Sequence, residues 1–325
     1  MIADAPLRLP ADRPAFAWAT WRLTVLFAVG VLAARIVYLI WLCPYQLAAD
    51  EAQYWDWSRR LDLSYYSKGP GVAWAIAAST RPFGVSEWAV RLPAALAAFI
   101  STLVLARLAM ACTKGNPRVG FVAALLFTLT PIFYGTSQFM TIDAPYITCW
   151  IVAAWLAWLV AGAAQEGRSS FRLWALLGAA LGLGFLFKYT MLLLIPGLLA
   201  FAWQQKLPPA ARWTRRLGGL VAAMAFGVAV SPVFIWNTRH GWPTLAHLLG
   251  HVGMPGGDVE PRHGWAYNPL WTVGYLLSPF VFLGPPAALL IGFALRRCWQ
   301  QRKLNGPDEP AIRFALATAL PVILF

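Results

Sequence analysis

The chain has 325 residues, of which 59% are hydrophobic and only 12% are charged. Soluble globular domains carry about 25% charged residues, so this composition excludes a soluble protein and indicates a polytopic membrane protein. With roughly 20 residues needed for each helical crossing, about eight to ten crossings fit, and no sizeable soluble domain fits beside them. The net charge of +13 does not indicate nucleic-acid binding, because the basic residues are spread over membrane-flanking loops.

Apolar runs follow one another along the chain. Residues 1–20 are predicted to form a short cytoplasmic tail and not a cleavable signal peptide, because the run that follows is long enough to span. Residues 21–325 then form one transmembrane domain, an all-α bundle of about nine transmembrane helices. Because the last residues stop inside an apolar run, we expect a further C-terminal part. The predicted spans are Trp21–Cys43, Trp88–Cys112, Val119–Gln138, Ala144–Ala164, Leu173–Phe187, Met191–Trp203, Leu217–Trp236, Leu270–Leu295 and a run from Phe314.

The distribution of basic residues predicts the orientation. With the N-terminus inside, the tail, the loops after the second, fourth, sixth and eighth spans, and the flanks of these segments hold 17 of the 26 Lys and Arg. Cytoplasmic loops are enriched in these residues, so the N-terminus is predicted to be cytoplasmic. The outer loops 44–87 and 237–269 then lie on the other side of the membrane, together with the turns that hold Asp143 and Lys188.

The first outer loop contains the stretch ADEAQYWDWSRRLDLSYYSKGP, residues 49–70, with four carboxylates, three basic residues and five aromatic ones. A membrane protein that gathers acids and bases at one face is expected to handle a charged substrate there. This stretch and the apolar piece Gly71–Thr80, which is too short to cross, are predicted to form helices in the membrane interface. Its aromatic residues could line a substrate path: Tyr54, Trp55, Tyr65 and Tyr66.

Three carboxylates are candidates for chemistry. Asp50 and Glu51 could cap an interfacial helix, or one of them could act as a general base or metal ligand. Capping needs only one acid, and acids near the membrane interior are costly, so function is favoured. Asp143 could cap the span that follows it, or it could face Asp50 and hold a divalent metal ion or orient a substrate.

Three basic residues are also candidates, and two of them allow two interpretations. Lys68, beside Gly69, could bind a phosphate as a point charge, or it could extend along apolar surface to reach water. Lys188, at the end of its span, allows the same two interpretations. Arg35 lies inside the first span, so a polar or anionic partner is expected.

All four histidines lie in the loop 237–269. His247 and His251 are four residues apart, which fits one face of a helix, and Asp258 and Glu260 follow them. No metal motif is complete, so we do not predict a structural zinc site. The cluster WNTRHGW is predicted to contact substrate or to pack at the interface, through Asn237, Arg239 and His240.

Taken together, these motifs resemble a known family. ADEAQYW, YYSKGP, EWAVRLPAAL, MTIDAPY, FKYTMLLLIPGLL and SPVFIWNTRHGW come in the order found in polyprenyl-phosphate-sugar glycosyltransferases of the GT-C fold. The sequence is most similar to bacterial relatives of protein O-mannosyltransferases and of the aminoarabinose and galacturonic acid transferases that modify lipid A and its core. The motifs cover most of the chain, and they indicate the superfamily but neither the sugar nor the acceptor.

The resemblance implies a multi-pass enzyme of the bacterial inner membrane that transfers a sugar from an undecaprenyl-type phosphate carrier to a lipid A, glycan or protein acceptor at the periplasmic face. We expect Asp50 to remove a proton from the acceptor and the anomeric carbon to invert. Lys68 would stabilise the leaving phosphate, with help from a divalent metal ion or from Lys188, Arg239 or Arg262. Relatives often have His-Pro-Pro or Glu-Lys-Pro where this chain has Ser67-Lys68-Gly69-Pro70.

A lipid-linked-sugar flippase or transporter is the alternative. Such a protein would use charges at the membrane midplane and broken helices related by an internal repeat. In this sequence the ionisable groups gather at one face, Arg35 is the one clearly inside a span, and no repeat stands out. These features favour an interfacial enzyme. A partial chain without activity is a third interpretation.

Overall fold

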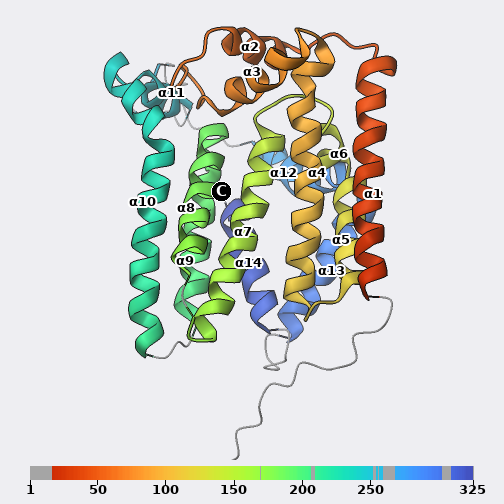
Figure 1. Cartoon of the computed structure of the whole chain (residues 1–325), viewed down its shortest axis with the longest axis vertical. Helices are drawn as coiled ribbons and strands as arrows, with labels where there is room; N and C mark the ends of the chain where they lie inside the picture. Colours follow the sequence, from red (N-terminus) through yellow and green to blue (C-terminus); the bar gives the residue numbers. More distant parts are fainter. Residues whose placement is uncertain are drawn as a thin grey trace, which may run out of the picture.

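The computed structural model describes residues 17–168, 170–205, 209–251, 254, 256–258, 268–301 and 309–324. Within these ranges its regular secondary structure is entirely helical, as predicted. A bundle of upright helices carries the short helices α2 and α3 across one end (Figure 1). The helices are α1 (Ala17–Val37) with the π-helical turn η1 (Tyr38–Leu42), α2 (Ala49–Arg59), α3 (Gly71–Phe83), α4 (Glu87–Cys112), α5 (Pro117–Leu129), α6 (Pro131–Thr136), α7 (Asp143–Gln165), α8 (Phe171–Phe187) with the 3-10 turn η2 (Tyr189–Leu193), α9 (Leu194–Gln204), α10 (Pro209–His240), α11 (Pro243–His251), α12 (Pro269–Phe282), α13 (Pro285–Gln301) and α14 (Glu309–Leu324).

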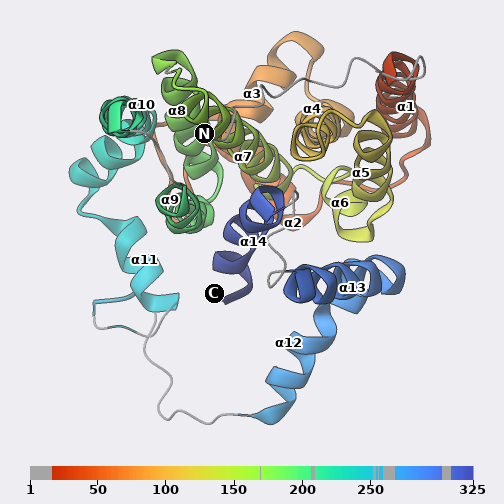
Figure 2. The same ribbon diagram turned by 90° about the horizontal axis from the view of Figure 1, so that it is seen from below.

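Helix α8 lies between α7 and α10, and α4 packs against α1, α5 and α7 (Figure 2). The larger apolar core joins α7, α8, α9, α10 and α14. Small residues let membrane helices approach closely, and the crossing of α8 with α10 depends on one. A Cβ atom on Gly178 would clash with the backbone of Ala222.

A second apolar core lies beneath α2 and α3, at the end of the bundle that these helices cross. Val72 and Ile76 of α3 are fully buried there against Val90 of α4 and Met140, which precedes α7. Tyr54 of α2 belongs to the same cluster. The apolar side of α3 is therefore covered by protein, which fixes α2 and the loop after it on the end of the bundle.

Two predicted spans are wrong as single helices. The segment 119–138 breaks at Thr130, which is extended (φ −69°, ψ 123°), and α6 begins at Pro131. Proline disfavours a helical conformation in the residue before it and has no N–H to donate. The segment 270–295 forms α12 and α13, which are bent by 107°. Gly284 adopts a positive φ of 78° at this bend, directly before Pro285.

Four helices of the described chain are long and apolar enough to cross a membrane, or five if the bent pair α12–α13 forms one span. The predicted number of about nine is not confirmed, because α5, α8 and the stretch from Tyr189 to Gln204 are shorter. The predicted outer loop 237–269 also starts too early. Helix α10 continues to His240, and α11 lies within the predicted loop.

Arg35 is buried in α1, where it faces an aromatic ring. Its guanidinium carbon lies 5.8 Å from the ring centroid of Tyr134 in α6, and its Nε has no hydrogen-bond partner among the described residues. The partner that we expected to be polar or anionic is therefore the face of a tyrosine, which attracts cations electrostatically.

Candidate active site

A buried ion pair between Glu51 and Arg91 fixes the start of α2. Arg91 donates from Nε to Glu51 Oε1 at 2.9 Å and from Nη2 to Oε2 at 2.8 Å. Glu51 is 0% exposed and Arg91 1%. The carboxylate also accepts from the backbone N–H groups of Ala48 at 3.0 Å and Met140 at 2.8 Å. A buried charge is tolerated when it is paired and hydrogen-bonded, and Glu51 meets both conditions.

Arg91 joins three segments of the chain that are distant in sequence. Besides Glu51, it donates to the backbone carbonyl of Tyr45 at 3.1 Å and to that of Gln46 at 2.8 Å. It therefore ties α4 to the chain entering α2 and, through Glu51, to Met140. Arg91 is not among the site residues predicted from the sequence. An arginine inside the apolar run EWAVRLPAAL needs a partner, by the same argument that singled out Arg35.

Asp50 precedes Glu51 but has a different environment. It is exposed, and no hydrogen bond or ion pair to it occurs within the described ranges. Tyr54, one turn further along α2, is buried, and this burial together with the charges of Asp50 and Asp143 raises the pKa of its phenol to about 12. The two predicted carboxylates, one from α2 and one from α7, therefore both act on the Tyr54 phenol.

Asp143 and Lys188 form a second, more open ion pair. Lys188 Nζ lies 2.8 Å from Asp143 Oδ1, and the two side chains are 38% and 36% exposed. Thr141 orients the carboxylate, because its hydroxyl donates to Asp143 Oδ2 at 3.3 Å and accepts from the Asp143 N–H at 3.2 Å. The Lys188 ammonium also lies 5.6 Å from the ring centroid of Tyr146. The N-terminus of α7 and the C-terminus of α8 thus present opposite charges side by side.

The loop that carries Lys68 rests on the end of α8. The carbonyl of Lys68 accepts from the Tyr65 N–H at 3.1 Å and from the Ser64 hydroxyl at 3.3 Å. Gly69 approaches the carbonyl oxygen of Leu186 so closely that a Cβ atom would clash. The Lys68 side chain is partly buried, and no interaction occupies its ammonium in the part of the chain described. This free cation therefore belongs to a loop anchored two residues before Lys188.

The loop aromatics differ in what they contact. Tyr65 stacks on Trp57 with a centroid distance of 4.5 Å, and its hydroxyl lies 3.0 Å from the Trp57 carbonyl oxygen. Tyr66 is exposed, and its hydroxyl donates to Asp258. That hydrogen bond raises the pKa of Tyr66 and lowers the pKa of Asp258. Tyr65 therefore has a mainly structural environment, whereas Tyr66 connects the first outer loop to the residues after α11.

The WNTRHGW motif makes the corner between α10 and α11. Asn237 is 2% exposed; it donates to the Val233 carbonyl at 2.9 Å and accepts from the Thr244 N–H at 3.3 Å. His240 stacks on Trp236, and Arg239 is exposed. Asn237 thus has a packing environment, while Arg239 lies on the surface at the same end of the bundle.

The described residues do not fit a divalent metal ion at Asp50 and Asp143. Such ions take several oxygen ligands, whereas no three His, Cys, Asp or Glu side chains of the described ranges are grouped to hold one. Lys188 also occupies an oxygen of Asp143. His247 and His251 share one helix face as predicted, with their Nε2 atoms 3.0 Å apart. The remaining residues predicted near this loop, Glu260, Arg262 and His263, lie outside the described ranges.

Comparison with known proteins places these residues in a family. Residues 67–236 match the family described as dolichyl-phosphate-mannose-protein mannosyltransferase. The chain is 35% identical to the lipid A galacturonosyltransferase RgtD of Rhizobium johnstonii, over 85% of this chain and 53% of that protein. It is 28% identical to the undecaprenyl phosphate-alpha-4-amino-4-deoxy-L-arabinose arabinosyl transferase of Pseudomonas aeruginosa, over 82% of this chain and 46% of that protein. The chain spans about half the length of the curated relatives it matches.

Solved structures share the fold. The crystal structure of ArnT from Cupriavidus metallidurans bound to undecaprenyl phosphate superposes with a TM-score of 0.63 over 95% of this chain and 58% of that one, at 18% sequence identity. The apo structure of the same protein gives a TM-score of 0.64 at 16% identity. The predicted GT-C-type helical fold is thereby confirmed.

Proposed function

The chain belongs to the dolichyl-phosphate-mannose-protein mannosyltransferase family, and from this premise we propose that it is a membrane glycosyltransferase. It moves a sugar from a polyprenyl-phosphate carrier to an acceptor, with lipid A or another envelope glycan preferred over protein. The names of its relatives support this substrate class, since they include a lipid A galacturonosyltransferase and an undecaprenyl phosphate-aminoarabinose transferase. The observation that carries the proposal is the partly exposed ion pair of Asp143 with Lys188, at the same end of the bundle as the exposed Asp50 of α2.

Asp50 is the proposed general base. Asp143 is already neutralised by Lys188, and Glu51 by Arg91, whereas Asp50 is exposed and has no cationic partner in the described chain. Asp50 accepts the proton of the acceptor hydroxyl as its oxygen attacks the anomeric carbon. The bond from that carbon to the carrier phosphate breaks on the opposite side, so the configuration inverts and the phosphate leaves with the electron pair.

The cations stabilise the phosphate that leaves. Charge that develops in a transition state is stabilised most by donors already in place, and Lys68 offers an ammonium with no competing partner in the described chain. Lys188 can exchange Asp143 for a phosphate oxygen, because the pair is open to solvent, and Arg239 is a further candidate. Glu51 holds α2 in position, and no step passes through a metal ion. Tyr66 and Trp55 are proposed to line the path of the sugar and the lipid.

The site lies on the periplasmic side in this proposal, with the N-terminus in the cytoplasm of a bacterial inner-membrane protein. The excess of Lys and Arg in the opposite loops supports this orientation.

The test is transfer of labelled sugar from undecaprenyl-phosphate donors to lipid A in proteoliposomes that contain the full-length protein. Asp50→Asn should abolish transfer. The matched control is Asp56→Asn, which removes an exposed acid of the same helix that pairs with Arg59 and should leave transfer unchanged. Full activity of Asp50→Asn would refute the assignment of the base. Movement of the lipid between leaflets without sugar transfer would refute the enzyme.

A further inference from the structure

An apolar cavity lies at the end of the bundle opposite the candidate active site. It has a volume of about 640 Å³ and is lined by α7, α8, α9 and α10. On α7 its lining runs from Ala157 to Ala164, near the end of the helix that begins with Asp143. The cavity separates α9 from α10, and these two helices make little contact with each other over their described residues. None of the residues of the candidate active site lines it.

One end of the cavity is basic. Arg215 and Arg216 line it together with Gln205, while the deeper lining is apolar. Arg215 donates to the carbonyl of Ala202 at the end of α9 at 2.7 Å, which leaves other guanidinium N–H groups for a ligand. Arg216 is exposed and is unpaired within the described ranges. A site with a cationic rim and an apolar interior is complementary to an anionic amphiphile.

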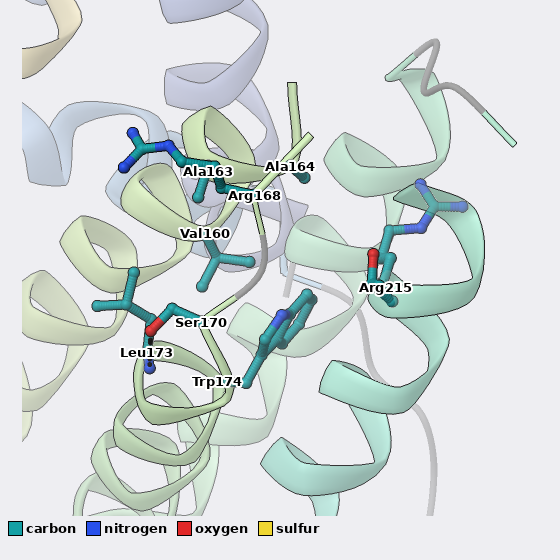
Figure 3. Close-up of a pocket in the computed structure, with 9 residues that line it drawn as sticks. Val160, Ala163, Ala164, Arg168, Ser170, Leu173, Trp174 and Arg215 are labelled. Atoms are coloured by element: carbon teal, nitrogen blue, oxygen red, sulfur yellow. Dashed lines mark hydrogen bonds between the residues drawn. The ribbon is translucent and has the colours of Figure 1, made fainter. Parts of the chain in front are cut away.

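A smaller pocket adjoins this rim. It shares Val160, Ala164, Trp174 and Arg215 with the large cavity and adds Arg168 and Ser170. Figure 3 shows Arg168 on one side of this pocket and Arg215 on the other, with the Trp174 indole between them. This pocket has a volume of only about 10 Å³, and Arg168 is paired with Glu166, so the pocket widens the basic rim at Arg215 without holding a headgroup itself.

The depth of the cavity selects among anionic lipids. On α10 its lining runs from Arg215 to Phe226, which at about 1.5 Å per residue is roughly 16 Å. This is about half of the roughly 30 Å hydrocarbon core of a bilayer, so the cavity matches the depth of one leaflet. A phospholipid acyl chain has that reach, whereas a long polyprenyl chain exceeds it.

We propose that this cavity binds one acidic glycerophospholipid of the leaflet opposite the candidate active site, with its phosphate at Arg215 and Arg216 and an acyl chain between α9 and α10. Basic pockets between transmembrane helices on the cytoplasmic side are known to hold anionic headgroups. The bound lipid fills the space between α10, which packs on α8, and α9, which packs on α14 and α7. It thereby holds α9 against the bundle.

Native mass spectrometry of the full-length protein tests the site, with phosphatidylglycerol, phosphatidylethanolamine and undecaprenyl phosphate each added in turn. The wild type should retain one phosphatidylglycerol in preference to phosphatidylethanolamine. Arg215→Gln with Arg216→Gln should lower phosphatidylglycerol retention by about 25-fold, since each basic residue near an anionic lipid contributes a factor of about five. Arg172→Gln, which removes a charge outside the cavity, should leave retention unchanged.

A second variant fills the cavity without touching its charge. A Cβ atom on Gly219 meets no atom within 4 Å, so Gly219→Leu places a side chain in the cavity without a backbone clash, and retention should be lost. Gly227→Leu is the matched control, because Gly227 is in the same helix with equal space but outside the lining. Equal retention of the two phospholipids, retention unaffected by Gly219→Leu, or displacement of phosphatidylglycerol by undecaprenyl phosphate would each overturn the proposal.

Discussion

Two ion pairs at the same end of the molecule differ in how far their side chains are buried. Both join an acid to a base at least 40 residues away, at 2.8 Å. Glu51–Arg91 is sealed and saturated with hydrogen bonds, whereas Asp143–Lys188 is more than one-third exposed. A sealed pair cannot exchange partners without leaving a buried charge, while an open pair can accept a substrate group in place of one member. From this comparison we propose that the first pair holds the fold and that the second pair contacts substrate.

The largest expected effect comes from breaking the sealed pair. Arg91→Met leaves Glu51 buried without a cation and should destabilise the fold by about 3–5 kcal/mol. The yield of monodisperse protein in detergent and its thermal unfolding would measure this. The double variant Glu51→Leu/Arg91→Met removes both charges and should recover part of the yield. Equal yields of Arg91→Met and wild type would show that the pair does not hold the fold.

Breaking the open pair should affect transfer more than stability. Lys188→Gln should cost less than about 1 kcal/mol of folding free energy, because the pair is partly exposed and screened. Sugar transfer should fall about 100-fold or more if Lys188 meets developing phosphate charge. Kinetics in proteoliposomes and thermal unfolding would separate the two effects. Lys188→Arg should restore part of the transfer, and full transfer by Lys188→Gln would remove the lysine from the site.

A smaller effect is expected where the Lys68 loop meets α8. Gly69→Ala forces a methyl group against the Leu186 carbonyl, which should shift Lys68 and reduce transfer by about tenfold, since small displacements of positioned groups are costly. The matched control is Gly135→Ala, because a Cβ atom there meets nothing within 4 Å. Transfer rates that are alike in the two variants would mean that the loop does not position Lys68.

The smallest effect concerns the contact between Tyr66 and Asp258. Hydrogen bonds from Tyr66 and then from His247 hold the pKa of Asp258 below its usual range. The lowered pKa means that this stabilisation is present above the unfolded-state pKa of about 3.9 and is lost as the pH falls through the folded-state value. Hydrogen exchange of α11 should therefore rise below about pH 4, and Asp258→Asn should weaken this dependence. Identical pH profiles of the variant and the wild type would contradict the contact.

Continuous apolar runs predicted the long helices well, because insertion of a 20-residue segment into a membrane depends on the composition of that segment. Helices α4 and α7 begin and end within a residue or two of the predicted spans. The predictions failed where the backbone breaks inside an apolar run, at Pro131 and at Gly284. The hydrophobicity of a run does not predict such breaks, although a proline within the run indicates one.

The sequence indicated candidate site residues but not the environment of each one. Asp50 and Glu51 are adjacent in sequence, and only the position of Arg91, forty residues later, decides which of them is buried. The pairing of Asp143 with Lys188 depends in the same way on how α7 and α8 pack. Tertiary contacts of this range leave no periodic pattern in the sequence.

The most direct test compares Glu51→Gln with Asp143→Asn in the full-length protein, with folded yield and sugar transfer measured on the same preparations. Glu51→Gln should lose folded protein, and the fraction that folds should retain transfer. Asp143→Asn should fold like the wild type and lose transfer. Normal yield of Glu51→Gln together with normal transfer by Asp143→Asn would contradict the division between the sealed and the open pair.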